Sequence, residues 1–411
     1  MLQPFRATFN KQQFSLARYQ ELLRRLAQRT RTPIDFRVCE TPCFFPRQLL
    51  DEMVEIGRNL THQLVDNPTY MQRSEAAIPD RYRVPNDNPR PNFMTVDFGL
   101  TRDSDGRLTP KLVELQAFPS IAGYQDVLCE EYVDVYCLNE GLDKKLDWRF
   151  AGLSHDRYWD LLRRTIVGGH DPENVVLLEA TPLLQKTLPD FNVYEDRLGV
   201  ATADIAQLTK QGNKLFYPRE GRLVPIERIY NRAIVDDLER NGVVPAFDYR
   251  DELAVEWAGQ PNWYFRISKF SIPYLDHPSV PHAVFLDRWF AGERGRLPDD
   301  RSRLLLKPLY SFAGKGIHFE PTDAELDAIP VQDRPLYLLQ ERVRFEPVIA
   351  TPEGMTQAEV RVMYVWPDGD AEMTPVTSLV RLGRGLMMGV DHNRDRTWVG
   401  GSAALFEGTA T

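Results

Sequence analysis

The stretch RLLLKPLYSFAGKGIHF, residues 303–319, decides the fold, because it sets two short apolar runs, LLL and IHF, on either side of a small-residue loop. This pattern predicts a β-hairpin. Gly314 and Gly316 let the backbone approach a ligand closely, and loop N–H groups can then point at phosphate oxygens. Lys307 ends the first run and Lys315 lies between the glycines, so the stretch predicts a phosphate site. A solvated turn is the alternative interpretation.

The overall composition is typical of a soluble globular protein of two or three domains. The chain has 411 residues, is 43% hydrophobic and carries a net charge of −9, which argues against a nucleic-acid or membrane surface. No apolar run approaches the roughly 18 residues of a membrane span. The N-terminus MLQPFRATFNKQQF lacks the apolar core of a secretory signal, and four cysteines are too few for a disulfide framework. We therefore expect a cytoplasmic protein whose partners include neither nucleic acid nor membrane.

The chain divides into three regions by its apolar periodicity. Residues 1–90 mainly repeat the i, i+3, i+4 spacing of amphipathic helices and end near the turn-rich segment VPNDNPRPN. Residues 172–242 follow a strand-then-helix rhythm, including one expected strand over 223–230, which predicts a small α/β unit. The remaining segments, 91–171 and 243–411, hold most of the other candidate strands, so a mixed α+β and α/β fold class is expected.

Two candidate strands, residues 93–98 and 111–116, carry oxygen-bearing side chains at neighbouring positions. Asp97 lies near the end of the first strand. Glu114 and Gln116 are two residues apart on the second, so they point to the same face. Carboxylate and amide oxygens suit a hard cation such as Mg²⁺. A sheet face turned to water would show the same residues, and both interpretations stay open.

Four basic residues elsewhere are candidates for contacts with anionic groups. Arg232 lies just past the expected strand end IYN, where open α/β sheets usually bind ligands. Lys269 stands in an aromatic-rich segment, and Arg381 and Arg384 belong to SLVRLGRG. Ordinary surface positions are the alternative for all four.

One later strand suits an adenine, and another carries two charged residues on one face. The run LYLLQERV leads into Gln340, Glu341 and Arg342 and closes at Val343, where a strand turning into a loop can offer its backbone to an adenine edge. The run EVRVMYV alternates, so that Glu359 and Arg361 share one face.

The order of these motifs over residues 92–407 resembles the ATP-grasp ligases, in particular the circularly permuted branch with eukaryotic-type glutathione synthetase and glutathionylspermidine synthetase. VDFGL and VELQAFPS stand where that family has an acidic strand and a Glu-x-Asn motif. KP followed by SFAGKG is similar to its Lys-Pro strand and glycine-rich loop, and QER to its hinge strand. YNR, SLVRLGRG and GGSAA resemble its substrate-domain, late-strand and closing-loop motifs.

The resemblance implies an ATP-grasp fold, in which two α+β subdomains clamp ATP, with an inserted small α/β substrate domain at 172–242 and a helical N-terminal region at 1–90. The nucleotide- and metal-binding core would comprise 91–171 and 243–411. It implies ATP and Mg²⁺ as cofactors. It also implies a ligase that joins a carboxylate to an amine through an acyl phosphate, with both substrates amino-acid or peptide-like. A homodimer is a possible oligomeric state. The implied roles are metal binding for Asp97, Glu114 and Gln116; nucleotide binding for Lys269, Lys307, Ser311, Gly314, Lys315, Gly316, Gln340, Glu341, Val343 and Glu359; and catalysis for Arg232, Arg381 and Arg384.

Three positions depart from the family pattern. Gln116 replaces the asparagine of Glu-x-Asn, Ser311 stands where glutathione synthetase places a metal-binding glutamate, and Thr95 replaces an arginine. These differences bear on the number of metal ions and on the substrate more than on ATP binding. A phosphotransferase on the same scaffold and a non-catalytic nucleotide-binding protein are the alternatives.

Overall fold

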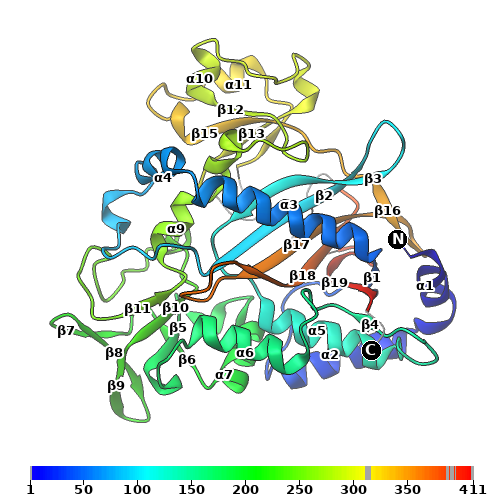
Figure 1. Ribbon diagram of the computed structural model, residues 1–411, viewed down its shortest axis with the longest axis horizontal. Coiled ribbons are helices and arrows are strands. Elements are labelled where there is room, and N and C mark those ends of the chain that lie inside the picture. Colours follow the sequence, from blue (N-terminus) through cyan, green and yellow to red (C-terminus); the bar gives the residue numbers. More distant parts are fainter. Residues whose placement is uncertain (1, 311–315, 386–387, 389–392, 394, 409–411) are drawn as a thin grey trace.

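The computed structural model, which describes residues 2–310, 316–385, 388, 393 and 395–408, is built around one large, mainly antiparallel sheet (Figure 1). Its main strand order is β1-β19-β18-β17-β2-β3, with β16 paired to β17 and β4 to β19. The strands are β1 (Cys43–Phe44), β2 (Phe93–Arg102), β3 (Leu108–Gln116), β4 (Leu146–Asp147), β16 (Pro347–Thr351), β17 (Gly354–Val365), β18 (Thr374–Gly383) and β19 (Gly400–Glu407).

Helices cover both faces of this sheet, because its strands alternate between two apolar sets. Val360, Val362 and Tyr364 of β17 belong to the core that also contains the apolar residues of α3, whereas Met363 and Val365 belong to the core shared with α5 and α6. Figure 1 shows α3 across one face and α2, α5 and α6 on the other. These helices are α2 (Leu16–Arg29), α3 (Arg47–Val65), α5 (Ala122–Val135) and α6 (His155–Ile166).

The N-terminal residues form helices that pack on and pair with the large sheet. Besides α2 and α3 they form α1 (Gln3–Thr8) and α4 (Pro68–Glu75). The short strand β1 adds in parallel to β19, with Cys43 opposite Ala404. The helical region is therefore joined to the edge of the sheet by backbone pairing.

A second, parallel sheet has the order β11-β10-β5-β6. It is flanked by a three-stranded antiparallel sheet, β7-β8-β9. The single strand predicted over 223–230 is wrong, because the chain breaks at Glu227 into β9 and β10, which belong to different sheets. The elements are β5 (Val175–Glu179), α7 (Leu188–Leu198), β6 (Ala201–Asp204), β7 (Thr209–Gln211), β8 (Lys214–Arg219), β9 (Arg222–Ile226), β10 (Arg228–Asn231), α8 (Val235–Arg240) and β11 (Glu256–Ala258). The last of these lies beyond the expected end of the unit at 242.

The third sheet contains the predicted hairpin, which is confirmed: β13 pairs antiparallel with β14, with Leu305 opposite Phe319. The order is β12-β15-β13-β14, and the sheet stands at the top of Figure 1. A 3₁₀ helix, Lys269–Tyr274, contacts both β3 of the large sheet and β12 of this one. The elements here are α9 (Pro261–Arg266), β12 (Ala283–Phe285), α10 (Leu286–Phe290), β13 (Leu304–Pro308), β14 (His318–Phe319), α11 (Asp323–Asp327) and β15 (Tyr337–Glu341).

None of the helices in the described part of the chain is both long and apolar enough to cross a membrane.

Candidate functional site

A row of charged side chains crosses one face of the large sheet. Asp97 on β2 is directly opposite Glu114 on β3 and Arg361 on β17, so all three point to the same side. Arg361 donates from Nε and Nη2 to the two oxygens of Asp97, at 2.6 and 2.7 Å. This bidentate contact fixes the arginine geometrically as well as electrostatically.

A second ion pair continues the row toward β18. Arg381 lies opposite Glu359 in the register, and its Nη1 is 2.5 Å from Glu359 Oε1 and 3.2 Å from Asp97 Oδ2. Burial acts to raise the pKa of both carboxyls; the two arginines overcome it at Asp97, whose pKa is lowered, but not at Glu359, whose pKa is raised. Both oxygens of Asp97 thus accept from guanidinium groups, which makes this carboxylate a poor metal ligand.

Lys307 reaches this face from the third sheet. Its Nζ lies 3.4 Å from the carbonyl oxygen of Val113, which is released from the strand ladder because the β2–β3 register shifts between Asp97 and Phe98. Burial disfavours the charged amine and lowers the pKa of Lys307 to about 8, although Glu114 acts in the opposite direction. Strands far apart in the sequence therefore meet at one cluster of charges.

Glu114 stands at the centre of that cluster. Its Oε1 accepts a hydrogen bond from Gln116 Nε2 and lies 3.5 Å from Lys269 Nζ. Its Oε2 accepts no hydrogen bond from any residue the structure describes. Of the three predicted metal ligands, Glu114 is the one whose carboxylate keeps an oxygen open to a cation.

The predicted nucleotide-binding residues of the third sheet divide between its two faces. Gln340 lies opposite Leu305 and therefore shares a face with Lys307, and its buried Oε1 has no partner among the described residues. Glu341 points to the other face, where it pairs with Arg303 at 2.6 Å. Val343, half-buried, follows the strand, and Gly316 takes a left-handed φ of 73° just before β14. Ser311, Gly314 and Lys315 lie outside the described residues.

Arg232 joins the cluster through the loop that follows β3. Its Nη1 donates to the backbone oxygen of Ser120 at 2.7 Å and to Asp190 Oδ2 at 3.2 Å. The hydroxyl of the same Ser120 accepts from Arg361 Nη1 at 3.4 Å. The carboxyl end of the parallel sheet and the charged face of the large sheet are thus in contact.

Arg384 does not join these residues. Its side chain donates to Thr351 and Thr356 and pairs with Glu353, all in the β16–β17 hairpin. Arg384 follows the last residue of β18, and its hydrogen bonds hold its side chain against the β16–β17 hairpin.

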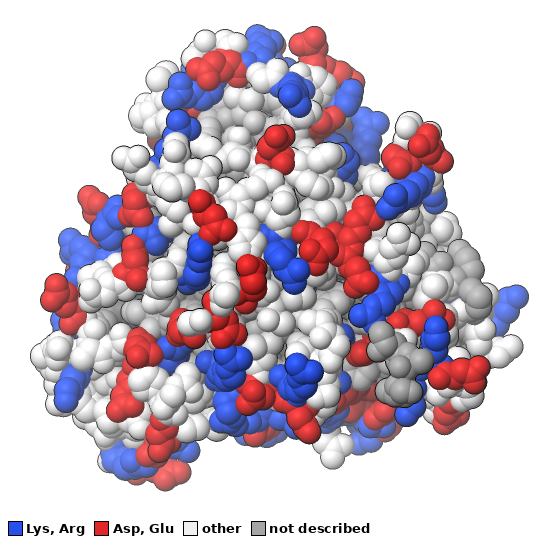
Figure 2. Space-filling model, viewed as in Figure 1, with Lys and Arg blue, Asp and Glu red and all other residues white. Residues whose placement is uncertain are grey.

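Three participants received no role from the sequence: Arg361, Ser120 and Asp190. The sequence did contain a pattern that points to Arg361, because the alternation along β17 places it on the same face as Glu359. No sequence pattern points to Ser120 or Asp190, since their contacts depend on how separate segments pack. The charged face is also distinct from the general surface, where Figure 2 shows basic and acidic side chains interspersed.

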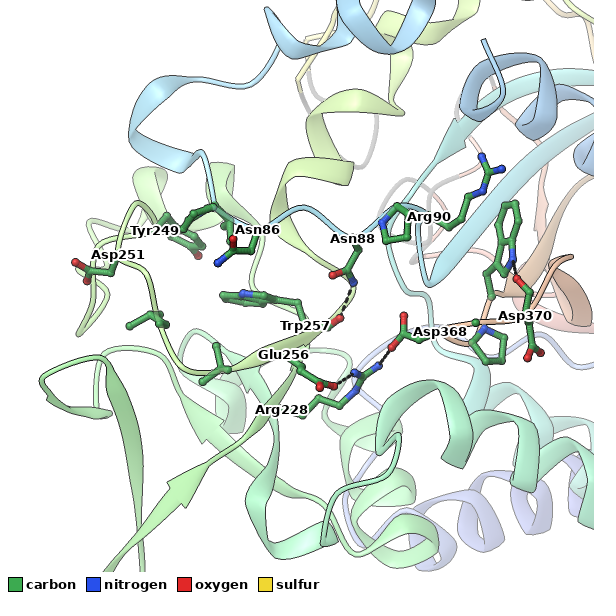
Figure 3. Close-up of a pocket in the computed structure, with 18 residues that line it drawn as sticks. Asn86, Asn88, Arg90, Arg228, Tyr249, Asp251, Glu256, Trp257, Asp368 and Asp370 are labelled. Carbon is green, nitrogen blue, oxygen red and sulfur yellow. Dashed lines mark hydrogen bonds and ion pairs between the residues drawn. The ribbon is translucent and has the colours of Figure 1, made fainter. Parts of the chain in front are cut away.

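A separate cavity lies elsewhere in the fold. It has a volume of about 570 Å³ and is lined by the 84–90 linker, the first residues of β10 and β11, and the turn after β17 (Figure 3). Arg228 crosses its floor and pairs with Glu256 and Asp368, each at 2.7 Å. This cavity is at the amino ends of the parallel strands, opposite Arg232, and it shares no residue with the charged cluster.

One further group of possible ligand atoms lies among the described residues: Asp126, Glu130 and His155. Arg149 already pairs with Asp126 at 2.7 Å and with Glu130 at 2.9 Å. A resident guanidinium supplies the positive charge there, so the arrangement does not favour a metal ion.

No protein-family model and no curated protein sequence matches the chain. Among solved structures, the chain is similar to a glutathione synthetase-like effector from Globodera pallida, with a TM-score of 0.59 over 95% of this chain and 96% of that one. The two are 12% identical, so the likeness concerns the fold. The chain therefore has a mixed α and β, glutathione synthetase-like fold, which confirms at this level the resemblance that the motif order suggested.

Proposed function

We propose that this protein is an ATP-grasp ligase, which uses ATP to activate a carboxylate as an acyl phosphate and joins it to an amine with release of ADP and phosphate. The observation that carries the proposal is the meeting of Lys307 with the Val113–Glu114 segment. Phosphoryl transfer depends mainly on alignment and on neutralising charge, and a buried lysine beside an open carboxylate is suited to both.

In this proposal the third sheet and the large sheet are the two subdomains that clamp the nucleotide. Lys307 and Lys269 contact the phosphates, the β15 edge near Gln340 and Val343 holds the adenine, and Glu359 faces the ribose. Glu114, oriented by Gln116, would hold Mg²⁺, which neutralises phosphate charge when bound. One open carboxylate fits this ion, because Mg²⁺ is commonly held by one or two carboxylates together with substrate phosphates and water.

The arginines orient the reacting carboxylate. Arg232 and Arg381 are the candidates, with Arg361 added to them, because all three belong to the connected cluster around Ser120 and Asp97. Asp97 acts by fixing Arg361 and Arg381 rather than by binding the metal. Arg384 is assigned to the β16–β17 hairpin instead.

ADP release is the direct test, measured with ATP, Mg²⁺ and pairs of amino acids or short peptides as carboxylate and amine. Glu114→Gln should reduce Mg²⁺-dependent ADP release by at least about a hundredfold, because it removes the charge that holds the ion. Glu252→Gln, at an exposed glutamate, should leave it unchanged. Normal turnover by the Glu114 variant, or no ADP release with any substrate pair, would contradict the proposal.

Hydroxylamine separates a ligase from a phosphotransferase on the same scaffold. An acyl phosphate is trapped as a hydroxamate, whereas a stable phosphorylated product is not. Hydroxamate formation that depends on the carboxylate substrate is the expected result.

A further inference from the structure

The cavity beside the 84–90 linker is a candidate binding site that the proposed ligase reaction does not use. Its volume of about 570 Å³ lies within the range of roughly 300–1,000 Å³ that is typical of small-molecule sites. Figure 3 shows Trp257 near the middle of the lining and Tyr249 toward one end. Trp366, several prolines and aliphatic side chains also line the cavity, so it offers an apolar wall to the body of a ligand.

The charged groups that meet at the floor of this cavity leave it negative. Glu256 and Asp368 share Arg228 as their ion-pair partner, each at 2.7 Å. His170 lies 3.0 Å from Glu256 and 3.1 Å from Glu227. Three carboxylates therefore face one guanidinium and one imidazole, and the group remains negative even when His170 is protonated.

The negative side chains are also the accessible ones. Those of Glu256 and Asp368 are 61% and 52% exposed, whereas that of Arg228 is 2% exposed. The hydrogen bonds with His170 and then with Arg228 lower the pKa of Glu256, so its carboxylate is charged at neutral pH. Both of these bonds are made to Oε2, and Oε1 of Glu256 accepts none from the residues that the structure describes. A cation that enters the cavity thus meets an open carboxylate oxygen.

The geometry favours an organic cation over a metal ion. Within the described part of the chain, the carboxylates of this cavity belong to no set of three ligand atoms close enough to hold a metal. Two guanidinium groups of the chain already show which contacts the walls support. Arg228 forks between two carboxylates, and the guanidinium carbon of Arg90 lies 5.2 Å from the ring centroid of Trp366. A planar cation can combine both contacts, because its edge donates to a carboxylate and its face stacks on an indole.

We propose that this cavity binds a planar organic cation, whose guanidinium or amidinium group pairs with Glu256 and whose apolar body lies against Trp257. Such a group can donate two parallel hydrogen bonds to one carboxylate, which an ammonium group does not do. A free small molecule and an arginine side chain of a partner protein present the same cation. The cavity shares no residue with the charged cluster around Asp97, so its occupation depends on neither nucleotide nor Mg²⁺.

Calorimetry of the full chain with benzamidine tests the proposal, and benzamide is the neutral control of nearly the same shape. Benzamidine should bind at millimolar concentrations and at least about tenfold more tightly than benzamide, in line with a charged hydrogen bond. Glu256→Gln and, separately, Asp368→Asn should each reduce this preference severalfold, because each removes one accessible negative charge from the cavity. Asp105→Asn, which removes an equal charge from the exposed turn between β2 and β3, should keep it.

A second pair of probes identifies the source of the cation. If Nα-acetyl-arginine methylamide is preferred over its citrulline analogue as strongly as benzamidine is over benzamide, the cation belongs to a partner protein; a preference confined to benzamidine assigns it to a free small molecule. Thermal unfolding checks that both carboxylate variants are folded. No binding of benzamidine, equal binding of benzamidine and benzamide, or an unchanged preference in a folded Glu256 or Asp368 variant would each overturn the proposal.

Discussion

Replacing Lys307 by methionine should make the protein more stable while weakening nucleotide binding. The lysine side chain is buried, at 4% exposure, and its pKa is lowered from 10.5 to about 8 because burial disfavours the ammonium group. Methionine has a similar unbranched length and no charge, so it removes the cost of burying the cation. Opposite effects on stability and on binding are typical of a functional residue that strains the fold.

The magnitude follows from the lowered pKa. A fall from 10.5 to about 8, at about 1.4 kcal/mol for each pH unit, means that the charged form costs about 3 kcal/mol in the folded state. The folded protein binds fewer protons than the unfolded chain between about pH 8 and 10.5, so wild-type stability rises with pH in this window. The advantage of Lys307→Met is therefore greatest below pH 8 and disappears near pH 10.5.

Urea unfolding at pH 7 and pH 10 measures this difference. At pH 7 the variant should gain roughly 1–3 kcal/mol, and at pH 10 the gain should be much smaller. Lys214→Met, at an exposed lysine, should change neither value by more than about 0.5 kcal/mol. ATP affinity should fall by about 1.5–3 kcal/mol in Lys307→Met. A pH-independent loss of stability, or unchanged ATP affinity, would refute the reasoning.

Three further outcomes are expected. Arg361→Ala should cost about 3–5 kcal/mol in urea unfolding, because Asp97 would stay buried with its bidentate partner removed, and a loss below about 1 kcal/mol would show that the pair is not structural. Gly57→Ala should lower the free energy of unfolding by about 1–3 kcal/mol, since the new methyl group would overlap the Tyr364 hydroxyl across the helix–sheet contact; a neutral result would mean that α3 can move away. ADP affinity should fall between pH 7 and pH 9 as Lys307 loses its proton, and this dependence should be absent in Lys307→Met when measured by calorimetry.

The local pattern of the chain was sufficient to predict the elements of the site. The hairpin of β13 and β14, the strands that carry Asp97 and Glu114, and the shared face of Glu359 and Arg361 all follow from period-two alternation and from turn residues. These features depend on residues close in sequence, where sterics and backbone geometry restrict the choices. The mixed fold class and the likeness to glutathione synthetase could also be predicted from the sequence, because they depend on the order of short local motifs.

The partners of these side chains were decided by the tertiary structure alone. Asp97 accepts from two arginines instead of facing a cation because β17 and β18 pair beside β2 in one particular register, and a shift of one residue would turn every side chain to the other face. Lys307 finds an acceptor because a bulge frees Val113 on a strand almost two hundred positions earlier in the chain. The contact between Arg232 and Ser120 likewise depends on packing, since it forms only when segments far apart in the sequence come together.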